Sequence, residues 1–349
     1  MGECAMRIDI IANDGSPLGI IPSDIYGEGD RIGIGGAELA LMTLCQGWAE
    51  QGHQVRLYNN PRRQEKSDFT QHPIDTFIPR EDRDILIIFR SPNHRIGDAK
   101  GKKIWWSCDQ YTVGDFAKFS KKVDRIVTIS PFHAEHFRSV YGIEDTVTID
   151  LPVRLRDYWD SPENACEKVP NRLIYCSVPD RGLSVLAQAY PRIKQEIPDV
   201  SLVITSDYRL WGLPNPQNEQ FLRKFMGMDG VKFLGALPRR QMVDEQMKAQ
   251  VQAYPCTYHE LFCYAVAECQ VAGAYPITPN IGSLGTTNMG TLLGGDAINP
   301  HWIKSFADEV ISTLKDKKLF EKQVDVSRMA GERFSLKKIL KEWEKVFND

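Results

Sequence analysis

The sequence predicts an α/β protein built from two similar halves. Its 349 residues are too many for one ordinary core and fit two domains of roughly 150 to 180 residues each. Short apolar, β-branched runs alternate with longer helical patterns in both halves, which is typical of parallel sheets covered by helices. A stretch rich in Pro, Asp and Glu near residues 157–171 separates the two series. Two domains also imply a cleft between them.

Strands and helices alternate in both halves. Strands of the first half are expected at 7–13, 54–59, 84–89, 103–107, 125–130 and 146–151, with a helix at 37–52. Strands of the second half are expected at 172–178, 201–207, 231–237, 251–255 and 275–279, with helices at about 182–196, 217–227, 238–249 and 262–273. The predicted domains therefore cover 1–155 and 156–334, and 335–349 form a last helix.

The composition excludes several classes of protein. The formal net charge of −3 gives no reason to expect a nucleic-acid partner. No apolar run approaches the ~20 residues of a membrane span, and the N-terminus lacks the pattern of a secretion signal, so a cytoplasmic protein is expected. The eight cysteines include no C-x-x-C pair and are expected to be buried thiols. His133 and His136 lack an H-E-x-x-H frame and are expected on a helix surface.

The last helix has an apolar stripe on one face and lysines on the other. The stripe consists of Leu336, Ile339, Leu340, Trp343, Val346 and Phe347. We expect it to pack back toward the N-terminal domain. The alternative is a basic amphipathic helix on an anionic membrane, which usually has more aromatic residues. Peripheral membrane contact is therefore not indicated.

A glycine pair precedes the first long helix. Gly35 and Gly36, in GIGGAELALM, allow backbone amides to approach a ligand, and the N-terminus of the following helix favours an anion. The stretch is not a G-x-G-x-x-G motif, since Leu39 stands where the third glycine is expected. A plain tight turn explains the pair equally well.

Arg181 is expected at the carboxyl edge of the second sheet, after a strand that ends near Val178 and before a helix that starts near Gly182. Ligands bind at this edge in open α/β sheets. A guanidinium offers a permanent cation and a planar set of donors to a diphosphate. Pairing with Asp180 or with solvent is the equally good alternative.

Two glutamates stand in an otherwise small and apolar run, HELFCYAVAECQVAGAYPITP. An unpaired charge in a core costs several kcal/mol, so Glu260 and Glu268 need partners. With Glu260 just before a helix and Glu268 two turns along it, a rise of ~1.5 Å per residue separates them by about 12 Å, the reach of a nucleotide sugar. One carboxylate would bind sugar hydroxyls, the other ribose hydroxyls, and the helix N-terminus the diphosphate. The alternative is one exposed and one salt-bridged glutamate.

Over nearly its whole length, the sequence resembles glycosyltransferase family 4, retaining enzymes of the GT-B fold that use nucleotide sugars. The segments that carry the likeness are IGGAELALMTLCQGWAEQGHQVRLY, DRIVTISPFHAEHFRSVYGI, SVPDRGL, VKFLGAL and YHELFCYAVAECQVAGAYPITPNIGSLGTT. The resemblance implies two Rossmann-like domains that face a cleft, with the acceptor on the N-terminal side and the donor on the C-terminal side.

The family's motifs match residues of this chain. Its E-x7-E pattern falls on Glu260 and Glu268, and its lysine or arginine for phosphate on Arg181, followed by Gly182. The resemblance also assigns an acceptor-side loop to Gly35 and Gly36, and a turn that lines the base pocket to Gly235. It places main-chain contacts to phosphate at Leu261, Phe262 and Cys263.

The sequence also departs from the family. Leu261 and Cys263 stand where members commonly have glycine, which leaves less space for phosphate. The arginine that often precedes the phosphate-binding residue is missing, with Ser177 near its place. Where many members have a histidine after the fourth strand, the chain has Cys108 and Asp109. Asp109 is the candidate for a positioning role near the sugar, although a carboxylate beside a diphosphate would be repelled.

The resemblance implies transfer of a sugar from a nucleoside-diphosphate sugar, expected to be a UDP- or GDP-sugar, to a glycan, lipid-linked or other hydroxyl acceptor. No further cofactor is expected. Catalysis would fall to Glu260, Arg181 and Asp109, with retention by same-face attack. The loop 15–31 and the aromatic residues Trp105, Trp106 and Tyr111 are expected to border the acceptor, although two adjacent tryptophans on a strand are as easily core.

One alternative is rejected and two stay open. A D-x-D sequence, Asp82-Arg83-Asp84, would hold a metal in other transferases, but it directly precedes a strand and no catalytic metal is expected. An epimerase or hydrolase of the same fold would consume the donor without an acceptor. A non-catalytic nucleotide-sugar-binding protein would explain the lost glycines and the missing arginine.

Overall fold

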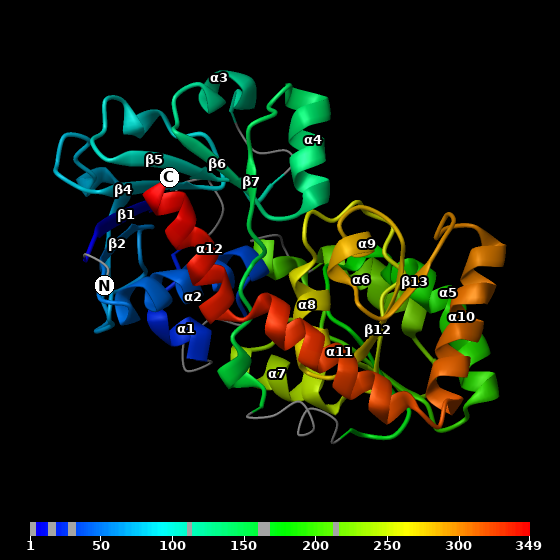
Figure 1. Ribbon diagram of the computed structural model, residues 1–349. Helices are drawn as coiled ribbons and strands as arrows, with labels where there is room; N and C mark the ends of the chain where they lie inside the picture. Colours follow the sequence, from blue (N-terminus) through cyan, green and yellow to red (C-terminus); the bar gives the residue numbers. More distant parts are fainter. Residues whose placement is uncertain (1–4, 13–18, 27–32, 110–113, 160–167, 212–215) are drawn as a thin grey trace. The chain divides into compact units, whose positions relative to one another are not determined.

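Each half of the chain contains one sheet in which every pair of neighbouring strands is parallel (Figure 1). The computed structural model describes residues 5–12, 19–26, 33–109, 114–159, 168–211 and 216–349. Unit 1 comprises Met1–Gly29, Ile34–Pro152 and Leu336–Asp349, and unit 2 comprises Asp30–Gly33 and Val153–Ser335. The predicted α/β class and its two parallel sheets are thereby confirmed.

The sheet of unit 1 has the strand order β3-β2-β1-β4-β5-β6-β7. Its strands are β1 (Arg7–Ala12), β2 (Gln54–Tyr58), β3 (Thr70–His72), β4 (Ile85–Phe89), β5 (Lys102–Trp106), β6 (Arg125–Thr128) and β7 (Val147–Thr148). Its helices are α1 (Pro22–Tyr26), α2 (Gly36–Glu50), α3 (Phe116–Ser120), α4 (Pro131–Tyr141) and α12 (Leu336–Asn348). Every residue of the central strand β4 is buried, as in a strand covered on both faces.

The sheet of unit 2 repeats this order as β10-β9-β8-β11-β12-β13. Its strands are β8 (Arg172–Tyr175), β9 (Ser201–Ile204), β10 (Val231–Phe233), β11 (Val251–Ala253), β12 (Tyr275–Pro279) and β13 (Thr291–Leu293). Its helices are α5 (Leu183–Glu196), α6 (Pro216–Leu222), α7 (Arg239–Lys248), α8 (Tyr264–Val271), α9 (Leu284–Thr287), α10 (Pro300–Lys315) and α11 (Leu319–Phe334).

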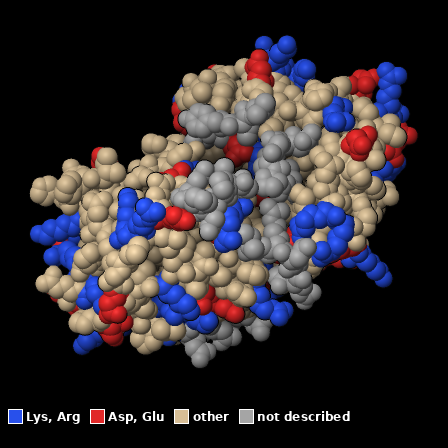
Figure 2. All heavy atoms as spheres, turned by 180° about the vertical axis from the view of Figure 1, so that it is seen from behind, with Lys and Arg blue, Asp and Glu red and all other residues tan. Residues whose placement is uncertain are grey.

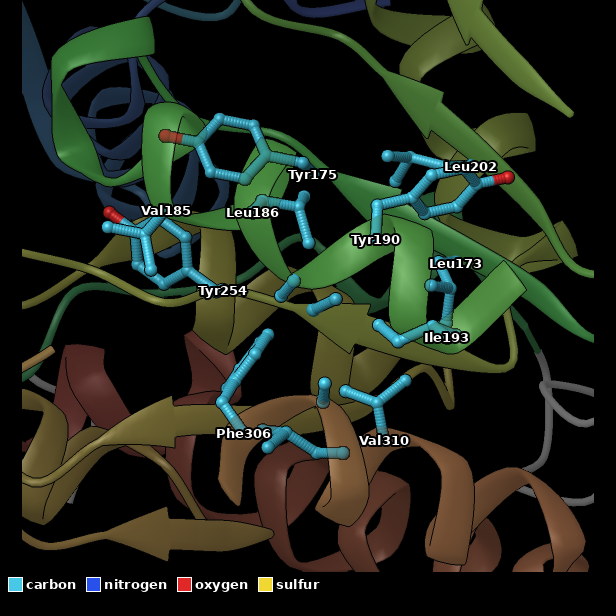
Figure 3. Close-up of a cluster of buried hydrophobic side chains, with 14 of the residues drawn as sticks. Leu173, Tyr175, Val185, Leu186, Tyr190, Ile193, Leu202, Tyr254, Phe306 and Val310 are labelled. Carbon is cyan, nitrogen blue, oxygen red and sulfur yellow. The ribbon is translucent and has the colours of Figure 1, made fainter. Parts of the chain in front are cut away.

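The side chains of β8 alternate between two cores of unit 2. Leu173 and Tyr175 belong to the larger core, in which α5 and α10 bring together residues such as Tyr190 and Phe306 (Figure 3). Ile174 and the adjoining Cys176 belong to a smaller core, together with Ala249, Cys269 and Ala274. This alternation follows from the two-residue period of a β-strand.

The apolar stripe of α12 is buried against α2 within unit 1. The Trp343 side chain is 1% exposed and packs edge-on against Trp48, with ring centroids 5.4 Å apart. A Cβ at Gly47 would lie 2.9 Å from a methyl group of Leu340 and 3.2 Å from those of Leu336, so these leucines would have to shift to accommodate a larger residue. The stripe therefore has an apolar partner within the protein.

The two adjacent tryptophans of β5 are core residues. The Trp105 side chain is fully buried against Phe116, Phe119 and Phe137, and Trp106 packs against Phe89 and Trp343. The expectation that these tryptophans border an acceptor is therefore wrong, because a ring with no exposed face cannot stack on a sugar. Tyr111 and much of the loop 15–31 lie outside the described residues.

The surface agrees with the small net charge. On the face that Figure 2 shows, basic and acidic residues are interspersed, without a continuous basic surface among the atoms drawn in colour. No helix among the described residues combines the length and the apolar character needed to cross a membrane.

We expect Trp343→Ala to destabilise the protein by about 3 to 5 kcal/mol, because it leaves a cavity where α12 meets α2. Urea unfolding followed by tryptophan fluorescence and far-UV circular dichroism would measure the change. Lys345→Ala on the exposed face of the same helix is the matched control and should change stability by less than about 0.5 kcal/mol. Equal effects of both substitutions would show that the stripe does not hold α12 in place.

Candidate functional site

The strand order changes direction between β8 and β11, and the candidate site of unit 2 lies there. From β8 the chain runs to β9 and β10 on one side, and β11, β12 and β13 follow on the other. Ligands of open α/β sheets bind beyond the carboxyl ends of the strands at such a switch point. The segment that follows β8 contains Arg181, and the segment that follows β11 contains Glu260.

Arg181 and Glu260 form an ion pair across this switch point. The Arg181 Nε lies 3.5 Å from Glu260 Oε1, and the two side chains are 15% and 18% exposed. Arg181 Nη1 also lies 3.1 Å from Asp180 Oδ2, and the guanidinium carbon lies 3.5 Å from the ring centre of Tyr258. Arg181 therefore pairs with Asp180, as one interpretation expects, and also with Glu260, while its binding of a diphosphate stays a prediction.

Burial and ion pairing shift the pKa values of Glu260 and Arg181 in opposite directions. Burial raises the pKa of Glu260, and the nearby Arg181 and the hydroxyl of Tyr254 offset part of this rise. Burial by itself would lower the pKa of Arg181, but the carboxylates of Glu260 and Asp180 outweigh it and raise that pKa. The site therefore combines a permanent cation with a carboxylate that is only partly solvated.

Tyr254 orients the carboxylate of Glu260 by a hydrogen bond. Its hydroxyl donates to Glu260 Oε1 at 2.9 Å and lies 3.2 Å from Ser177 Oγ. The Tyr254 side chain is fully buried in the larger core, and burial raises the pKa of its phenol. The tyrosine remains a neutral donor at ordinary pH and fixes the direction of the carboxylate.

Two glycines let the loops of the site approach one another. A Cβ at Gly182 would lie 2.0 Å from the carbonyl oxygen of Pro255, and its φ is +119°. A Cβ at Gly282, where φ is +54°, would lie 2.9 Å from the carbonyl oxygen of Glu260. Only glycine avoids both the collision and the strain at such positions. Gly182 therefore brings the start of α5 against the segment after β11.

Leu261, Phe262 and Cys263 link Glu260 to α8, and all three are buried. Cys263 precedes the helix with φ +64° and ψ 72°, in the left-handed region that favours glycine. Its carbonyl accepts the first helical hydrogen bonds, from the amides of Val266 and Ala267. A non-glycine residue there costs about 1 to 2 kcal/mol, and such strain is concentrated at functional sites.

Glu268 lies in α8 and is paired within the protein. Its Oε1 accepts from Arg239 Nη1 at 2.5 Å, and the two side chains are 8% and 4% exposed. Arg239 also lies 3.1 Å from Asp157 Oδ2 and donates to the hydroxyl of Tyr158. The expectation of one exposed and one salt-bridged glutamate is wrong, since both glutamates have guanidinium partners.

Gly235 lies in a turn that Asp207 holds from the end of β9. Asp207 Oδ2 accepts from the amide of Ala236 at 3.2 Å and from Arg209, while Oδ1 accepts from Asn218 at 2.8 Å. Gly235 has φ +68°. Burial alone would raise the pKa of Asp207, but hydrogen bonds from Arg209, Asn218 and Ala236 outweigh it and lower the pKa to about 2.

Unit 1 has its own pair of charges at its switch point, between β1 and β4. Arg90, directly after β4, lies 2.8 Å from Glu38 Oε1 on α2 and 3.1 Å from Asp109 Oδ2 after β5. The Arg90 and Glu38 side chains are 9% and 14% exposed, whereas that of Asp109 is 40% exposed. Arg90 has a left-handed backbone with φ +67°, and its carbonyl accepts from the indole of Trp105.

The glycine pair of unit 1 faces an internal anion. Gly36 begins α2, and Gly35 before it has an extended backbone with φ −71°. A Cβ at Gly35 would lie 2.3 Å from Glu38 Oε2, so this carboxylate occupies the space beside the glycine. A negative charge near a helix N-terminus is stabilised by the helix dipole. A further anion at this turn would compete with Glu38.

His133 is buried, so its predicted surface position is wrong. Its Nδ1 accepts from the amide of Ile129 at 3.3 Å, and its ring packs edge-on against Phe137. Burial, and secondarily the nearby His136, lower its pKa to about 3, while a hydrogen bond to the backbone of Asp109 acts in the opposite direction. His133 is therefore a neutral residue beneath Asp109.

The three residues of the D-x-D sequence have partners within unit 1. Arg83 is buried and donates to Asp9 Oδ2 at 2.7 Å, Asp82 pairs with Lys100, and Asp84 accepts from the amide of Arg7. Among the residues that the structure describes, no three His, Cys, Asp or Glu side chains are grouped as they would be to hold a metal ion. The six cysteines within the described ranges are buried and in no disulfide, as predicted.

Sequence reasoning missed the residues that hold the site in place. Tyr254, Tyr258 and Arg239 are ordinary members of a strand end, a loop and a helix start, and nothing in their local sequence marks them. Arg90 carries a weak signal, because it is a charge directly after the wholly apolar strand ILIIF. Such a charge at the carboxyl edge of a parallel sheet is a reasonable candidate.

The left-handed backbone of Cys263 predicts that Cys263→Gly is more stable than Cys263→Ala by about 1 kcal/mol, because only glycine relieves the strain. Urea unfolding of both variants would measure the difference. Ala267→Gly, inside α8, is the control and should instead lower stability by about 1 kcal/mol or more. A less stable Cys263→Gly would show that the loop is not strained.

The lowered pKa of Asp207 predicts a stability that depends on acid. Its ionised form stabilises the folded state fully above its unfolded pKa near 4, and this stabilisation is lost as the pH falls toward 2. At pH 6 the free energy of unfolding should be roughly 1 to 2 kcal/mol larger for the wild type than for Asp207→Asn. Urea unfolding between pH 6 and pH 3 should show the difference shrinking, and a constant difference would contradict the assigned interactions.

Comparison with known proteins places the fold. No protein-family model and no curated protein sequence matches the chain. Among solved structures, sucrose-phosphate synthase from Thermosynechococcus elongatus has a TM-score of 0.73 and 15% identity, with 98% of each chain covered. A glycosyltransferase from Rickettsia africae has a TM-score of 0.70 and 15% identity, with 98% of each chain covered.

A third similar structure is HepE from Anabaena in complex with UDP-glucose. It has a TM-score of 0.69 and 14% identity, and covers 99% of this chain and 100% of its own. These TM-scores show a shared fold, and at identities this low the likeness shows the fold alone. The chain therefore has the GT-B fold of these proteins, with two Rossmann-like domains.

Proposed function

We propose that this protein is a retaining glycosyltransferase that moves a sugar from a nucleoside-diphosphate sugar to an acceptor hydroxyl. UDP- and GDP-sugars are the proposed donors, and the acceptor is a glycan, a lipid-linked molecule or another hydroxyl compound. The observation that carries the proposal is the Arg181–Glu260 pair at the switch point of unit 2. Membership of glycosyltransferase family 4 and a cytoplasmic location are part of the same proposal.

Unit 2 is the proposed donor side. Arg181 would bind the diphosphate and stabilise the negative charge that develops on it as the glycosidic bond breaks. Gly182 and the amides of Leu261, Phe262 and Cys263 at the start of α8 would add neutral donors. Fixed donors of this kind are effective because they need no reorganisation when charge develops.

Glu260 would accept hydrogen bonds from the sugar hydroxyls. Tyr254 already orients this carboxylate, and Arg181 keeps a cation beside it. Burial leaves the carboxylate poorly solvated and thereby raises its pKa, and hydroxyl donors from a sugar would supply the missing solvation. This is the physical reason to place a sugar, rather than a second anion, at Glu260.

Glu268 and Gly235 would bind the nucleoside. Arg239 engages Oε1 of Glu268 at 2.5 Å and Gln246 lies 3.4 Å from Oε2. A ribose hydroxyl would thus meet a carboxylate whose position is already fixed, and Gly235 would line the pocket for the base. The fixed pair lowers the conformational cost of binding but leaves little freedom to adjust to another ligand.

Unit 1 is the proposed acceptor side, with Gly35, Gly36 and Asp109. Arg90 lies beside Asp109 and offsets its charge, which reduces the repulsion expected between Asp109 and a diphosphate. Asp109 would position the reacting sugar or hydroxyl. In same-face attack the leaving phosphate takes the proton of the acceptor, so no carboxylate nucleophile and no catalytic metal are invoked.

Two features of similar structures support a nucleotide-sugar donor. HepE was solved with UDP and glucose, with UDP-glucose, and with UDP. AviGT4, which has a TM-score of 0.68 to this chain, is described as a glycosyltransferase involved in avilamycin A biosynthesis. A non-catalytic binding protein or an epimerase would share the donor side, so the assay must include turnover.

Calorimetric titration with UDP, GDP and ADP tests the donor side. We expect Arg181→Ala to weaken binding of the cognate diphosphate by about 10- to 100-fold, because a charge-assisted hydrogen bond contributes about 1.5 to 3 kcal/mol. Arg181→Lys should restore part of this affinity. The matched control is Arg192→Ala, which removes an exposed ion pair between Arg192 on α5 and Asp308 on α10 and should leave affinity unchanged.

Transfer is then tested with Glu260→Gln and a panel of acceptors. Diphosphate affinity should stay within a few-fold of wild type, while transfer of sugar falls by about 100-fold or more. Donor consumption without acceptor would favour the epimerase or hydrolase. Binding with no turnover over a broad panel would favour the binding protein, and no binding of any nucleotide would remove the proposal.

A further inference from the structure

Two thiols of unit 2 lie in contact although they are 93 residues apart in the chain. Cys176 directly follows β8, Cys269 lies in α8, and their sulfur atoms are 3.3 Å apart. The side chains belong to the smaller core, on the face of the sheet that also holds Ile174, Ala249 and Ala274. Cys269 is fully buried and Cys176 is 8% exposed. Both are reduced in this structure.

The surroundings distinguish the two sulfurs. Gln252, which is fully buried, donates from Nε2 to Cys176 Sγ at 3.6 Å. Burial, and then the hydrogen bond with Cys176, raise the pKa of Cys269 well above its usual value. Cys176 Sγ thus accepts from Gln252, and Cys176 is the more exposed residue of the two, so it is the better placed to react first.

The other thiols of unit 2 are held differently. Cys256 Sγ donates to the carbonyl of Tyr258 at 3.3 Å and accepts from the amide of the same residue. Cys263 directly precedes α8 and belongs to the larger core, on the opposite face of the sheet. Within the described ranges, the Cys176–Cys269 contact is the thiol pair with sulfurs at hydrogen-bonding distance.

We propose that Cys176 and Cys269 form a modification site at which a hydroperoxide converts two thiols to a disulfide. In the first step the Cys176 sulfur attacks the peroxide, the O–O bond breaks, and Cys176 becomes a sulfenic acid with release of water or an alcohol. In the second step the Cys269 thiol attacks that sulfur and the hydroxyl leaves as water. The thiols lose two electrons and two protons, and the peroxide is reduced.

The bond requires a small movement. A disulfide is about 2.05 Å long, so the sulfurs must approach by about 1.2 Å. The high pKa of Cys269 predicts that the second step is slow at neutral pH and faster as the pH rises. A small exposure of Cys176 restricts access to small oxidants such as hydrogen peroxide.

Each cysteine of the disulfide would adjoin a residue that belongs to the proposed donor site or contacts it. Cys269 follows Glu268, which Arg239 holds, and Cys176 precedes Ser177, whose hydroxyl lies 3.2 Å from the Tyr254 hydroxyl that orients Glu260. The expected effect on nucleotide affinity rests on the proposed function, whereas the disulfide itself does not. A severalfold weaker affinity for UDP or GDP in the oxidised protein is expected.

The experiment treats the folded, full-length chain with hydrogen peroxide, blocks remaining thiols before denaturation, and maps the peptides by mass spectrometry without reduction. We expect a Cys176–Cys269 peptide pair that has lost two hydrogen atoms and separates on reduction. In Cys269→Ser, dimedone should label Cys176 as a sulfenic acid, whereas in Cys176→Ser it should not label Cys269. Cys45→Ala, a buried thiol of unit 1, is the control and should still form the disulfide.

Three results would overturn the inference. One is peroxide treatment that leaves both thiols reduced while other cysteines react. Another is over-oxidation of Cys176 to a sulfinic acid with Cys269 unchanged, and the third is a disulfide to Cys256 or Cys263. Circular dichroism of each variant establishes that it is folded, so a negative result counts against the site. If the disulfide forms but no nucleotide binds even the reduced protein, the proposed function fails and the modification site stands.

Discussion

The ion pair between Arg181 and Glu260 is the constraint on which the site of unit 2 depends. A carboxylate that is 18% exposed is expensive to keep ionised, and removing one partner of such a pair leaves an uncompensated charge. The pair joins the segment after β8 to the segment after β11, and Gly182 and Gly282 make that approach sterically feasible. The architecture of the sheet and the chemistry of the site thus require the same contact.

Unit 1 also has an Arg–Glu ion pair at its switch point, with the positions of the arginine and the glutamate exchanged. In unit 2, Arg181 follows β8 and Glu260 follows β11, which are the first and fourth strands of that unit in chain order. In unit 1, Glu38 lies on α2, the helix after β1, and Arg90 follows β4. Each pair bridges the two strands between which the strand order reverses. At such a point two loops diverge, and opposite charges hold them together while leaving polar groups at the carboxyl edge. Of the two carboxylates that pair with Arg90 in unit 1, Asp109 is the more exposed.

The region around α8 concentrates strain and buried polarity. Cys263 holds a left-handed backbone at the start of the helix, and Glu260 and Glu268 are paired with arginines from two different elements. Tyrosine and glutamine side chains complete the hydrogen bonds of both carboxylates. Such a network is stabilising only when every member is present, so single changes here should affect both stability and ligand binding. The adjoining thiols would add a redox dependence to the same helix.

The amino-acid sequence by itself determined the strands and helices that carry the site. Alternation of apolar β-branched runs with helical patterns is a local property, so β8, β11 and α8 could be predicted, and Glu260, Glu268 and Arg181 could be selected from their immediate neighbours. The strand β3 is not predicted, because its residues Thr70–His72 read TQH and include no apolar side chain. The strand β13 and the helices α10 and α11 are also absent from the prediction.

Only the tertiary structure decided which residues become partners. Glu268 meets Arg239, Glu38 meets Arg90, and Cys176 meets Cys269 across 29, 52 and 93 positions of the chain. No local rule gives these pairs, because they arise from the order in which parallel strands assemble and from which face of the sheet each side chain occupies. The burial of Trp105 has the same origin, since phenylalanines of the later helices α3 and α4 cover it.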